Sequence, residues 1–202
     1  MLNNPYKLAQ FIKSGAKLRD MGEDVGYEVA FVGRSNAGKS SALNTLTSQR
    51  QLARVSKTPG RTQLMNIFAL DEDRRLIDLP GSGYAKVPEQ LKINWQVHLS
   101  DYLTNRQCLK GLVLLMDVRH PLKDLDTKMV EFALSRSVPV HILLTKSDKL
   151  GFGQAKQVLV KVQNHFKKHE SLVSVQLFSS LKHEGIDALI MKLNAWFQWS
   201  VG

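Results

Sequence analysis

The sequence predicts an α/β fold in three layers: a mostly parallel six-stranded sheet with one antiparallel strand, covered by helices on both faces. Short, nearly continuous apolar runs alternate with amphipathic segments along the chain, as is typical of parallel strands between helices. One connection, Asp71-Glu72-Asp73, is too short for a parallel crossover. The 202 residues suffice for one such domain but are few for two independent cores.

The first half of the chain supplies three of the predicted strands. Residues 27–32 form a short apolar run, which leads through a Gly-rich turn into a helix over 39–47. The runs 63–70 and 74–79 have the pattern of strands, and the polar connection between them forces an antiparallel hairpin. We therefore expect one strand of the sheet to run backwards.

The second half continues the alternation of helices and strands. A helix over 88–105 has Pro88 at its start, and Leu99 and Leu103 belong to its apolar face. The elements after it are expected to be a strand at 112–117, a helix at 124–135, a strand at 138–144, a helix at 154–169, a strand at 174–178 and a helix at 185–199. This order completes a sheet covered on both faces.

The first 22 residues stand outside this alternation. The spacing of Leu8, Phe11, Ile12 and Leu18 predicts an amphipathic helix. We therefore expect a helical extension over 1–22, followed by a single domain over 23–202. The sequence shows no internal repeat or low-complexity tract that would mark a second boundary.

Composition excludes several classes of protein. The apolar runs are far shorter than the roughly 20 residues that span a bilayer. Lys7 and Lys13 interrupt the N-terminal stretch where an export signal would be apolar. Cys108 is the only cysteine, which excludes an internal disulfide and a cysteine-based zinc site. We expect a cytoplasmic protein, and a monomer, because no apolar face is left over.

The charge is strongly basic and unevenly distributed. Lys and Arg number 28 against 18 Asp and Glu, which gives a formal net charge of +10. Residues 29–70 contain no acid, and neither do residues 154–169, which carry four lysines and two histidines. Such stretches attract polyanions by counterion release. Composition alone leaves a second interpretation open, namely a solvated helix face together with compensation of nucleotide charge.

Residues 33–40, Gly-Arg-Ser-Asn-Ala-Gly-Lys-Ser, fit the phosphate-binding pattern G-x-x-x-x-G-K-[ST] between a strand and a helix. The glycines let backbone N–H groups surround a β-phosphate, and Lys39 bridges the β- and γ-phosphates. The Ser40 hydroxyl is a ligand for Mg²⁺, and the positive end of the following helix points at the phosphates. The motif predicts a P-loop nucleotide site with Mg²⁺.

Three later segments indicate which nucleotide is bound. Asp78-Leu79-Pro80-Gly81 follows a strand, where the carboxylate holds Mg²⁺ through water and the Gly81 N–H contacts the γ-phosphate. Thr145-Lys146-Ser147-Asp148 ends another strand, and its last carboxylate accepts hydrogen bonds from N1–H and N2–H₂ of guanine, which adenine does not offer. Ser179 and Ser180, after the last strand, present a backbone N–H to the guanine oxygen. The order of these segments predicts a GTPase rather than an ATPase or a small-molecule kinase.

A further threonine must complete the Mg²⁺ site when the γ-phosphate is present. Our choice is Thr62, which lies between the P-loop helix and the second strand. Thr58 in the same segment is the competing candidate. We expect catalysis to rest on Lys39, Thr62 and the Gly81 N–H.

With these elements placed, the chain resembles the EngB (YihA/YsxC) family of bacterial GTPases, in the TrmE-Era-EngA-EngB-like class of P-loop GTPases. The resemblance covers nearly the whole chain. It rests on GRSNAGKSS at 33–41, KTPGRTQLMN at 57–66, DLPGSGYAKV at 78–87, TKSD at 145–148 and FSS at 178–180. It implies a Ras-like P-loop NTPase fold, so that residues 23–202 are one GTP-binding domain.

The resemblance also implies ligands and partners. Nucleotide contacts are expected from Gly33, Arg34, Ser35, Asn36, Ala37, Gly38, Lys39, Ser40, Gly60, Arg61, Thr62, Gln63, Leu64, Asp78, Leu79, Pro80, Gly81, Thr145, Lys146, Ser147, Asp148, Phe178, Ser179 and Ser180. Ser40, Thr62 and Asp78 are the expected Mg²⁺ ligands, Asp78 through water. The family implies a role in late assembly of the large ribosomal subunit, through rRNA and ribosomal proteins, and in normal septation. DNA and membranes are not expected partners.

Two residues bear on how fast GTP is hydrolysed. Ser82 stands where Ras-like switches carry a glutamine and where this family usually has a tyrosine, and a serine is a poor general base. Related GTPases use an asparagine at the position of Asn36 to hold K⁺, although this residue also tolerates a strained loop backbone. We expect slow intrinsic hydrolysis, accelerated by K⁺ or by a bound particle. The alternative function is a GTP-controlled adaptor that acts directly on division or membrane-associated proteins.

Overall fold

The computed structural model describes residues 4–53, 64–81 and 89–199, except for the side chains of 89–95. Within these residues one seven-stranded sheet has the order β1-β3-β4-β2-β5-β6-β7. Its strands are β1 (Gln10–Gly15), β2 (Tyr27–Gly33), β3 (Met65–Ala69), β4 (Arg74–Asp78), β5 (Leu109–Asp117), β6 (Val140–Thr145) and β7 (Val173–Leu177). The helices are α1 (Lys39–Thr47), α2 (Glu89–Asn105), α3 (Asp124–Ser135), α4 (Phe152–His165) and α5 (Ile186–Phe197).

Strand β3 runs against the rest of the described sheet. It is antiparallel to both of its neighbours, β1 and β4, whereas each neighbouring pair from β4 to β7 is parallel. The predicted hairpin is confirmed, with Asn66 opposite Asp78 and Ala69 opposite Arg75. The α/β class and the single reversed strand are therefore as predicted. The sheet has one strand more than the six predicted.

The additional strand comes from the N-terminal segment, where the helix predicted over 1–22 is wrong for the described residues. Two short 3₁₀ turns, η1 (Pro5–Leu8) and η2 (Leu18–Met21), flank β1, which pairs with β3 at the edge of the sheet. Phe11 and Ile12 are exposed and do not form the buried stripe of a helix. The free edge of β3 offers backbone partners to an extended segment, and a helix could not use them.

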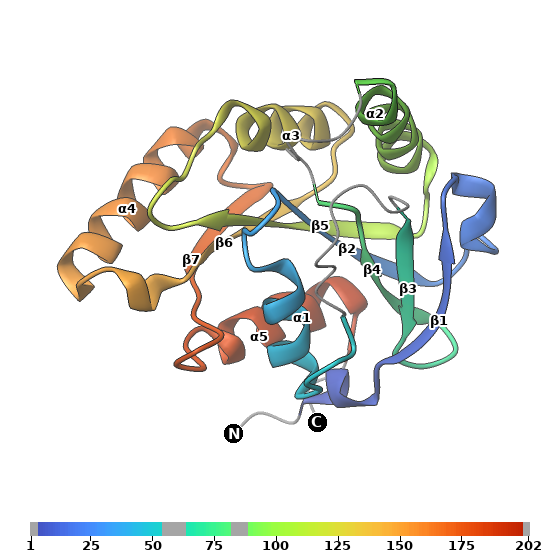
Figure 1. Cartoon of the computed structure of the whole chain (residues 1–202), viewed down its shortest axis with the longest axis horizontal. Coiled ribbons are helices and arrows are strands. Elements are labelled where there is room, and N and C mark those ends of the chain that lie inside the picture. The colour runs from blue at the N-terminus through green and yellow to red at the C-terminus, as the bar shows by residue number, and fades with distance from the viewer. Residues whose placement is uncertain (1–3, 54–63, 82–88, 200–202) are drawn as a thin grey trace.

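Two layers of helices cover the sheet. Helices α2, α3 and α4 lie on one face, and α1 and α5 lie on the other (Figure 1). On the first face Leu99, Val130 and Val162 pack against strand residues. On the second face Leu43 and Leu189 do the same, and Trp196 and Trp199 pack against that cluster. The predicted three-layer arrangement is confirmed, and in the described part of the chain no helix has the length and apolar character needed to span a membrane.

Candidate functional site

The predicted site residues gather at one edge of the sheet, where parallel strands reach their carboxyl ends. Strand β2 ends at Gly33, β4 at Asp78 and β6 at Thr145. The register brings these ends level, because Phe31 is opposite Asp78, and Asp117 at the end of β5 is opposite Thr145. In open α/β sheets this edge is where ligands bind. The fold therefore brings together motifs that are more than 100 residues apart in the sequence.

The P-loop connects β2 to α1 through a turn with two left-handed residues. Asn36 has φ 65° and Gly38 has φ 90°, and Gly38 is the residue before the helix. A Cβ atom at Gly33 would lie 3.0 Å from the Leu115 carbonyl oxygen, so the start of the loop needs a glycine for close packing. Asn36 adopts the strained conformation that the second interpretation of this residue required. Its K⁺ role stays a prediction.

Lys39 and Asp78 contact one another directly at the foot of the P-loop. The Lys39 Nζ atom forms an ion pair with Asp78 Oδ1, and the two side chains are only 13% and 9% exposed. Asp78 Oδ2 lies 3.4 Å from the Asn66 amide nitrogen of the neighbouring strand. The Leu79 N–H donates to the Phe31 carbonyl at 2.9 Å, which joins the start of the Asp78-to-Gly81 segment to β2. The predicted phosphate lysine and the predicted magnesium carboxylate are thus at one place.

We call residues 145–148 the guanine motif. Its first two residues, Thr145 and Lys146, connect it to the P-loop. The Thr145 hydroxyl donates to the Ala37 carbonyl at 2.6 Å and lies 3.2 Å from the Met116 carbonyl. Lys146 has a left-handed backbone, and its Nζ donates to the Asn36 carbonyl at 2.7 Å and lies 3.0 Å from Asp117 Oδ2. The lysine stem therefore bridges the P-loop and the end of β5.

Asp148 is held by the loop that follows β7. Ser179 Oγ donates to Asp148 Oδ1 at 2.6 Å, and this hydrogen bond lowers the pKa of the Asp148 carboxyl. The carboxylate is therefore ionised at neutral pH and keeps acceptor capacity for further donors. Ser147 Oγ donates to Glu184 Oε2 at 2.9 Å, which fixes the motif to the same loop.

The loop from Ser179 to Glu184 determines which of the two serines, Ser179 or Ser180, has a backbone N–H free to donate to the guanine oxygen. Ser179 and Glu184 exchange backbone hydrogen bonds of 3.1 and 3.0 Å, so the Ser179 N–H is already used. Phe178 is buried, and its carbonyl accepts the Ser147 N–H at 3.2 Å. Of the two serines, the bonds among described residues leave the Ser180 N–H for a ligand. The sequence alone does not distinguish the two serines.

Asp117 and Glu184 were not among the predicted site residues. Asp117 binds Lys146, and it also binds Arg119, whose Nη2 lies 2.7 Å from Asp117 Oδ2. The hydrogen bond from Arg119 is the main cause that lowers the pKa of the Asp117 carboxyl, and it keeps the group ionised. A signal for Asp117 was present, since it is a polar residue at the carboxyl end of a buried strand. Glu184 gives no comparable signal.

A hollow of about 220 Å³ adjoins the P-loop on the side of α3. Arg34, Ser35 and Asn36 line it, together with Asp126 from the first turn of α3. The Asp126 side chain is buried, with 3% of the residue exposed, and burial raises the pKa of its carboxyl to about 6. The Asp126 carboxyl therefore titrates closer to neutral pH than an ordinary aspartate does.

Several predicted residues lie outside the described residues. They are Thr58, Gly60, Arg61, Thr62, Gln63 and Ser82. Leu64 and Gly81, which border these segments, are half-buried. The choice between Thr62 and Thr58, and the effect of Ser82, therefore stay predictions.

Comparisons with known proteins identify the family. The family model described as 50S ribosome-binding GTPase matches residues 28–146. The probable GTP-binding protein EngB of Enterobacter sp. (strain 638) is 55% identical over 197 residues, which cover 98% of this chain and 95% of that protein. This chain belongs to the EngB family. The EngB protein of Shigella flexneri is 54% identical over 197 residues, covering 98% and 94%. An EngB chain of this kind is a P-loop GTPase that binds guanine nucleotide.

Solved structures agree on the fold. A crystal structure of a probable GTP-binding protein EngB has a TM-score of 0.69 at 19% identity and covers 86% of this chain and 100% of its own. The structure of Era in complex with MgGDPNP and nucleotides 1506–1542 of 16S ribosomal RNA has a TM-score of 0.64 at 24% identity, covering 85% and 57%. At these identities the likeness shows the fold alone, which is that of P-loop GTPases.

Proposed function

We propose that this EngB-family GTPase hydrolyses GTP with Mg²⁺ as a switch in late assembly of the large ribosomal subunit, and that this role is needed for normal cell division. The observation that carries the nucleotide part is the joining of three separate motifs at one edge of the sheet. Lys39 and Asp78 are in contact, and Lys146 spans from the P-loop to β5. The ribosomal part rests on the family description and on the net charge of +10.

The phosphate end is formed by residues 33–40 and the end of β4. The backbone N–H groups of the loop and the amino end of α1 donate to phosphate oxygens, and Lys39 neutralises their charge. Ser40 and Asp78 fit Mg²⁺, because a hydroxyl and a carboxylate are the hard oxygen donors that it prefers. Ser40 and Thr62 are the proposed direct ligands, and Asp78 would hold the ion through water. The ion, when bound, neutralises charge on the transferring phosphoryl group.

The base end discriminates guanine through Asp148 and Ser180. The ionised Asp148 accepts two hydrogen bonds from the N1–H and N2–H₂ edge, while the Ser180 N–H donates to O6. Adenine has an acceptor at N1 and a donor at C6, so it would leave both protein groups unpaired. Buried polar groups without partners give discrimination of several orders of magnitude. We therefore expect GTP to bind far more tightly than ATP, and equal affinities would contradict the assignment.

Hydrolysis is proposed to depend on positioning and charge. Lys39 and the Gly81 N–H contact the γ-phosphate, and Ser82 supplies no strong base. We propose that Asn36 holds K⁺ beside the phosphates and that GTP turnover is therefore faster in K⁺ than in Na⁺. Equal rates in the two salts, with and without ribosomal subunits, would contradict this part.

Sedimentation tests the ribosomal role. The protein is mixed with precursors of the large subunit in the presence of GTP or of GDP at moderate salt and then pelleted. We expect co-sedimentation with GTP and at least several-fold less with GDP, because a switch binds its target in one state. If the nucleotide makes no difference, the ribosomal role is wrong. An adaptor that acts directly on division or membrane-associated proteins would then be the better proposal.

A further inference from the structure

Helix α4 and the following 3₁₀ turn η4 (Lys167–His169) carry charge of one sign. From residue 149 to residue 169 the sequence contains no Asp or Glu. Two lysines lie in α4 and two in η4, and a histidine ends each of these elements: Lys156, Lys161, Lys167, Lys168, His165 and His169. We call the exposed surface of α4 and η4 the α4 face.

The cationic side chains of the α4 face point away from the protein. Helix α4 packs on the sheet through Val162, and Ala155 of the same helix is also buried. All four lysines and both histidines are exposed, and none of them takes part in a salt bridge among the described residues. In Figure 1 the helix lies at one end of the molecule, on the outer side of the sheet. The charge is therefore available to a partner.

Helix α3 shows that this pattern is not general for the covering helices. It lies on the same face of the sheet (Figure 1), yet its exposed residues include Asp124 and Glu131 as well as Lys128. Charges of both signs on one helix are typical of a solvated surface. An exposed surface with bases alone repels other cations and attracts a polyanion.

An aromatic residue stands at the start of the same surface. Phe152 is 80% exposed, and Lys156 follows it one helical turn later. Exposed phenylalanine costs solubility and contributes nothing to the core here, whereas a flat ring beside lysines is suited to stack on an unpaired base. The exposed amides of Gln163 and Asn164 add donors and acceptors without negative charge.

We propose that the α4 face is a binding surface for RNA, in which its lysines contact phosphates and Phe152 stacks on an unpaired base. The proposal rests on the ribosomal function proposed above and assigns the surface that meets the RNA. It also places the RNA close to the nucleotide, because Phe152 follows the guanine-binding Asp148 by four residues. A bound RNA would therefore lie beside the base end of the GTP site.

Charge neutralisation tests the lysine contacts. The variant Lys156→Gln, Lys161→Gln, Lys167→Gln, Lys168→Gln is compared with the control Lys7→Gln, Lys13→Gln, Lys123→Gln, Lys128→Gln, whose positions are also exposed. Each set lowers the formal net charge by four, from +10 to +6. The probe is a fluorescein-labelled RNA hairpin with an unpaired loop, followed by anisotropy. We expect the first variant to bind roughly 10- to 100-fold more weakly, with a salt slope smaller by about 2–3.

The control separates a specific surface from net charge. We expect the control variant to stay within about threefold of the wild type. Equal weakening of both variants would mean that total charge alone attracts RNA, and the proposal would be wrong. A wild-type protein that did not bind the hairpin would also overturn it.

Stacking is tested by Phe152→Ala, with Met191→Ala as the control, since Met191 is an exposed apolar residue on α5. We expect the first variant to bind the hairpin about 5- to 100-fold more weakly and to bind a fully paired RNA duplex unchanged. Equal loss for hairpin and duplex would refute the stacking role.

Failure of this proposal is distinguishable from failure of the proposed function. If the lysine variant still co-sediments with large-subunit precursors in GTP at the wild-type level, the α4 face is wrong and the ribosomal role stands. GTP affinity of each variant, measured first, confirms that the nucleotide site is intact.

Discussion

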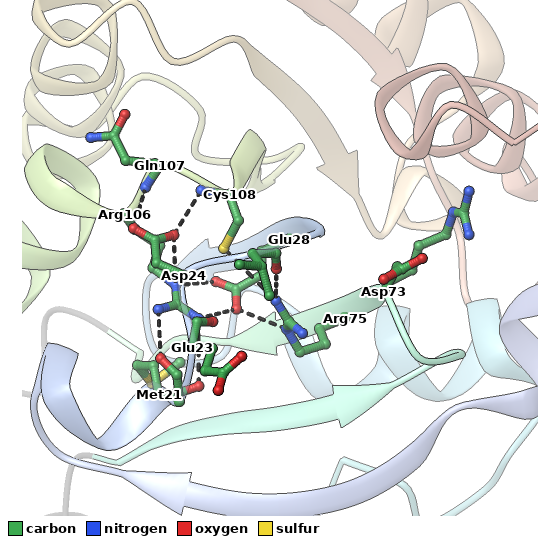
Figure 2. Close-up of polar contacts among 12 residues, drawn as sticks. Met21, Glu23, Asp24, Glu28, Asp73, Arg75, Arg106, Gln107 and Cys108 are labelled. Carbon is green, nitrogen blue, oxygen red and sulfur yellow. Dashed lines mark hydrogen bonds and ion pairs between the residues drawn. The ribbon is translucent and has the colours of Figure 1, made fainter.

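The two ends of the parallel strands hold polar side chains in different ways. At the carboxyl ends, polar groups of the P-loop and the guanine motif are mostly half-buried and lie beside backbone that ends in loops. At the amino ends, Glu28 of β2 is completely buried and accepts hydrogen bonds from side chains of β4, α2 and the chain before β5. Figure 2 shows the arginine donors, Arg75 and Arg106. The first end is suited to exchange partners with a ligand. The second has all its partners within the chain.

The amino-end network is centred on Glu28. Arg106 Nη2 lies 2.7 Å from Glu28 Oε1, and Arg106 Nε lies 3.0 Å from Oε2. Arg75 Nε donates to Oε1 and the Tyr102 hydroxyl donates to Oε2, both at 3.0 Å. Burial, and then the Glu28 charge, raise the pKa of Tyr102 well above its usual range, so the phenol stays a donor. Both carboxylate oxygens are thus satisfied by charge-assisted bonds.

Arg106 also connects the N-terminal segment to the sheet. Its Nη1 donates to the Gly22 carbonyl at 3.0 Å and its Nη2 to the Glu23 carbonyl at 2.9 Å. Nearby, Asp24 accepts the backbone N–H groups of Gln107 and Cys108 (Figure 2). Buried polar groups at the amino ends of the strands therefore hold the fold, and those at the carboxyl ends are arranged for a ligand.

The largest predicted effect tests the Glu28 network at the amino ends of the strands. Arg106→Ala would leave the buried Glu28 carboxylate with fewer charged partners and remove the bonds to residues 22 and 23. We expect the free energy of unfolding, measured with guanidinium chloride, to fall by about 3–5 kcal/mol. GTP affinity of the folded protein should be unchanged. Arg19→Ala is the control, because that side chain is 79% exposed and its removal should cost less than about 1 kcal/mol.

The next prediction tests the carboxyl ends of the strands, where we expect a substitution to change ligand affinity and to leave stability almost unchanged. Asp148→Asn keeps an oxygen that accepts the Ser179 hydroxyl, so we expect the free energy of unfolding to change by less than about 1 kcal/mol. The amide cannot accept from both guanine donors, and GTP affinity should fall about 100-fold. Xanthosine triphosphate, which carries an oxygen in place of the N2 amine, should then bind better than GTP. A variant that unfolds easily, or that still prefers GTP, would contradict the proposed difference between the amino and carboxyl ends of the strands.

The carboxyl end was largely predictable from sequence because its motifs are local. Residues 33–40 and 145–148 have fixed spacings that suit phosphate and guanine, and strand ends place them at one edge. The Lys146–Asp117 pair was not predictable, since it forms only when β5 and β6 are aligned. The same is true of the preference for Ser180 over Ser179, which depends on a bond to Glu184.

The amino end and the N-terminal segment were not predictable for the same physical reason. Glu28 and Arg106 are 78 residues apart, and no local pattern indicates that they pair. The spacing of Phe11 and Ile12 predicts a helix where the structure has β1. All residues of β1 except Gly15 are exposed, so its sequence has no alternation that would identify a strand. Its position depends on pairing with β3, from Gln10 opposite Ala69 to Gly15 opposite Met65.

The smallest predicted effect concerns Asp126, a buried acid beside the P-loop that lacks the donors of Glu28. Its pKa of about 6 in the folded protein is above the ordinary value of 3.8. The native state therefore binds the proton more tightly than the unfolded state, and stability falls as pH rises from about 4 to about 6. Asp126→Asn removes this loss. We expect the variant to be more stable than the wild type by about 1–2 kcal/mol at pH 7, less than the full shift implies because solvent screens the charge.

The pH dependence identifies Asp126 as the source of that gain. The stability difference between Asp126→Asn and the wild type should shrink towards zero as pH falls from 7 to 4, because the wild-type carboxyl is then protonated in the native state. Asp124→Asn, at an exposed position on the same turn of α3, is the matched control for the substitution itself. A difference that did not vary with pH would mean that Asp126 is already stabilised as a charged group. Asp126, in the hollow beside the P-loop, would then resemble Glu28 at the amino ends of the strands, whose charge is stabilised by hydrogen-bond partners.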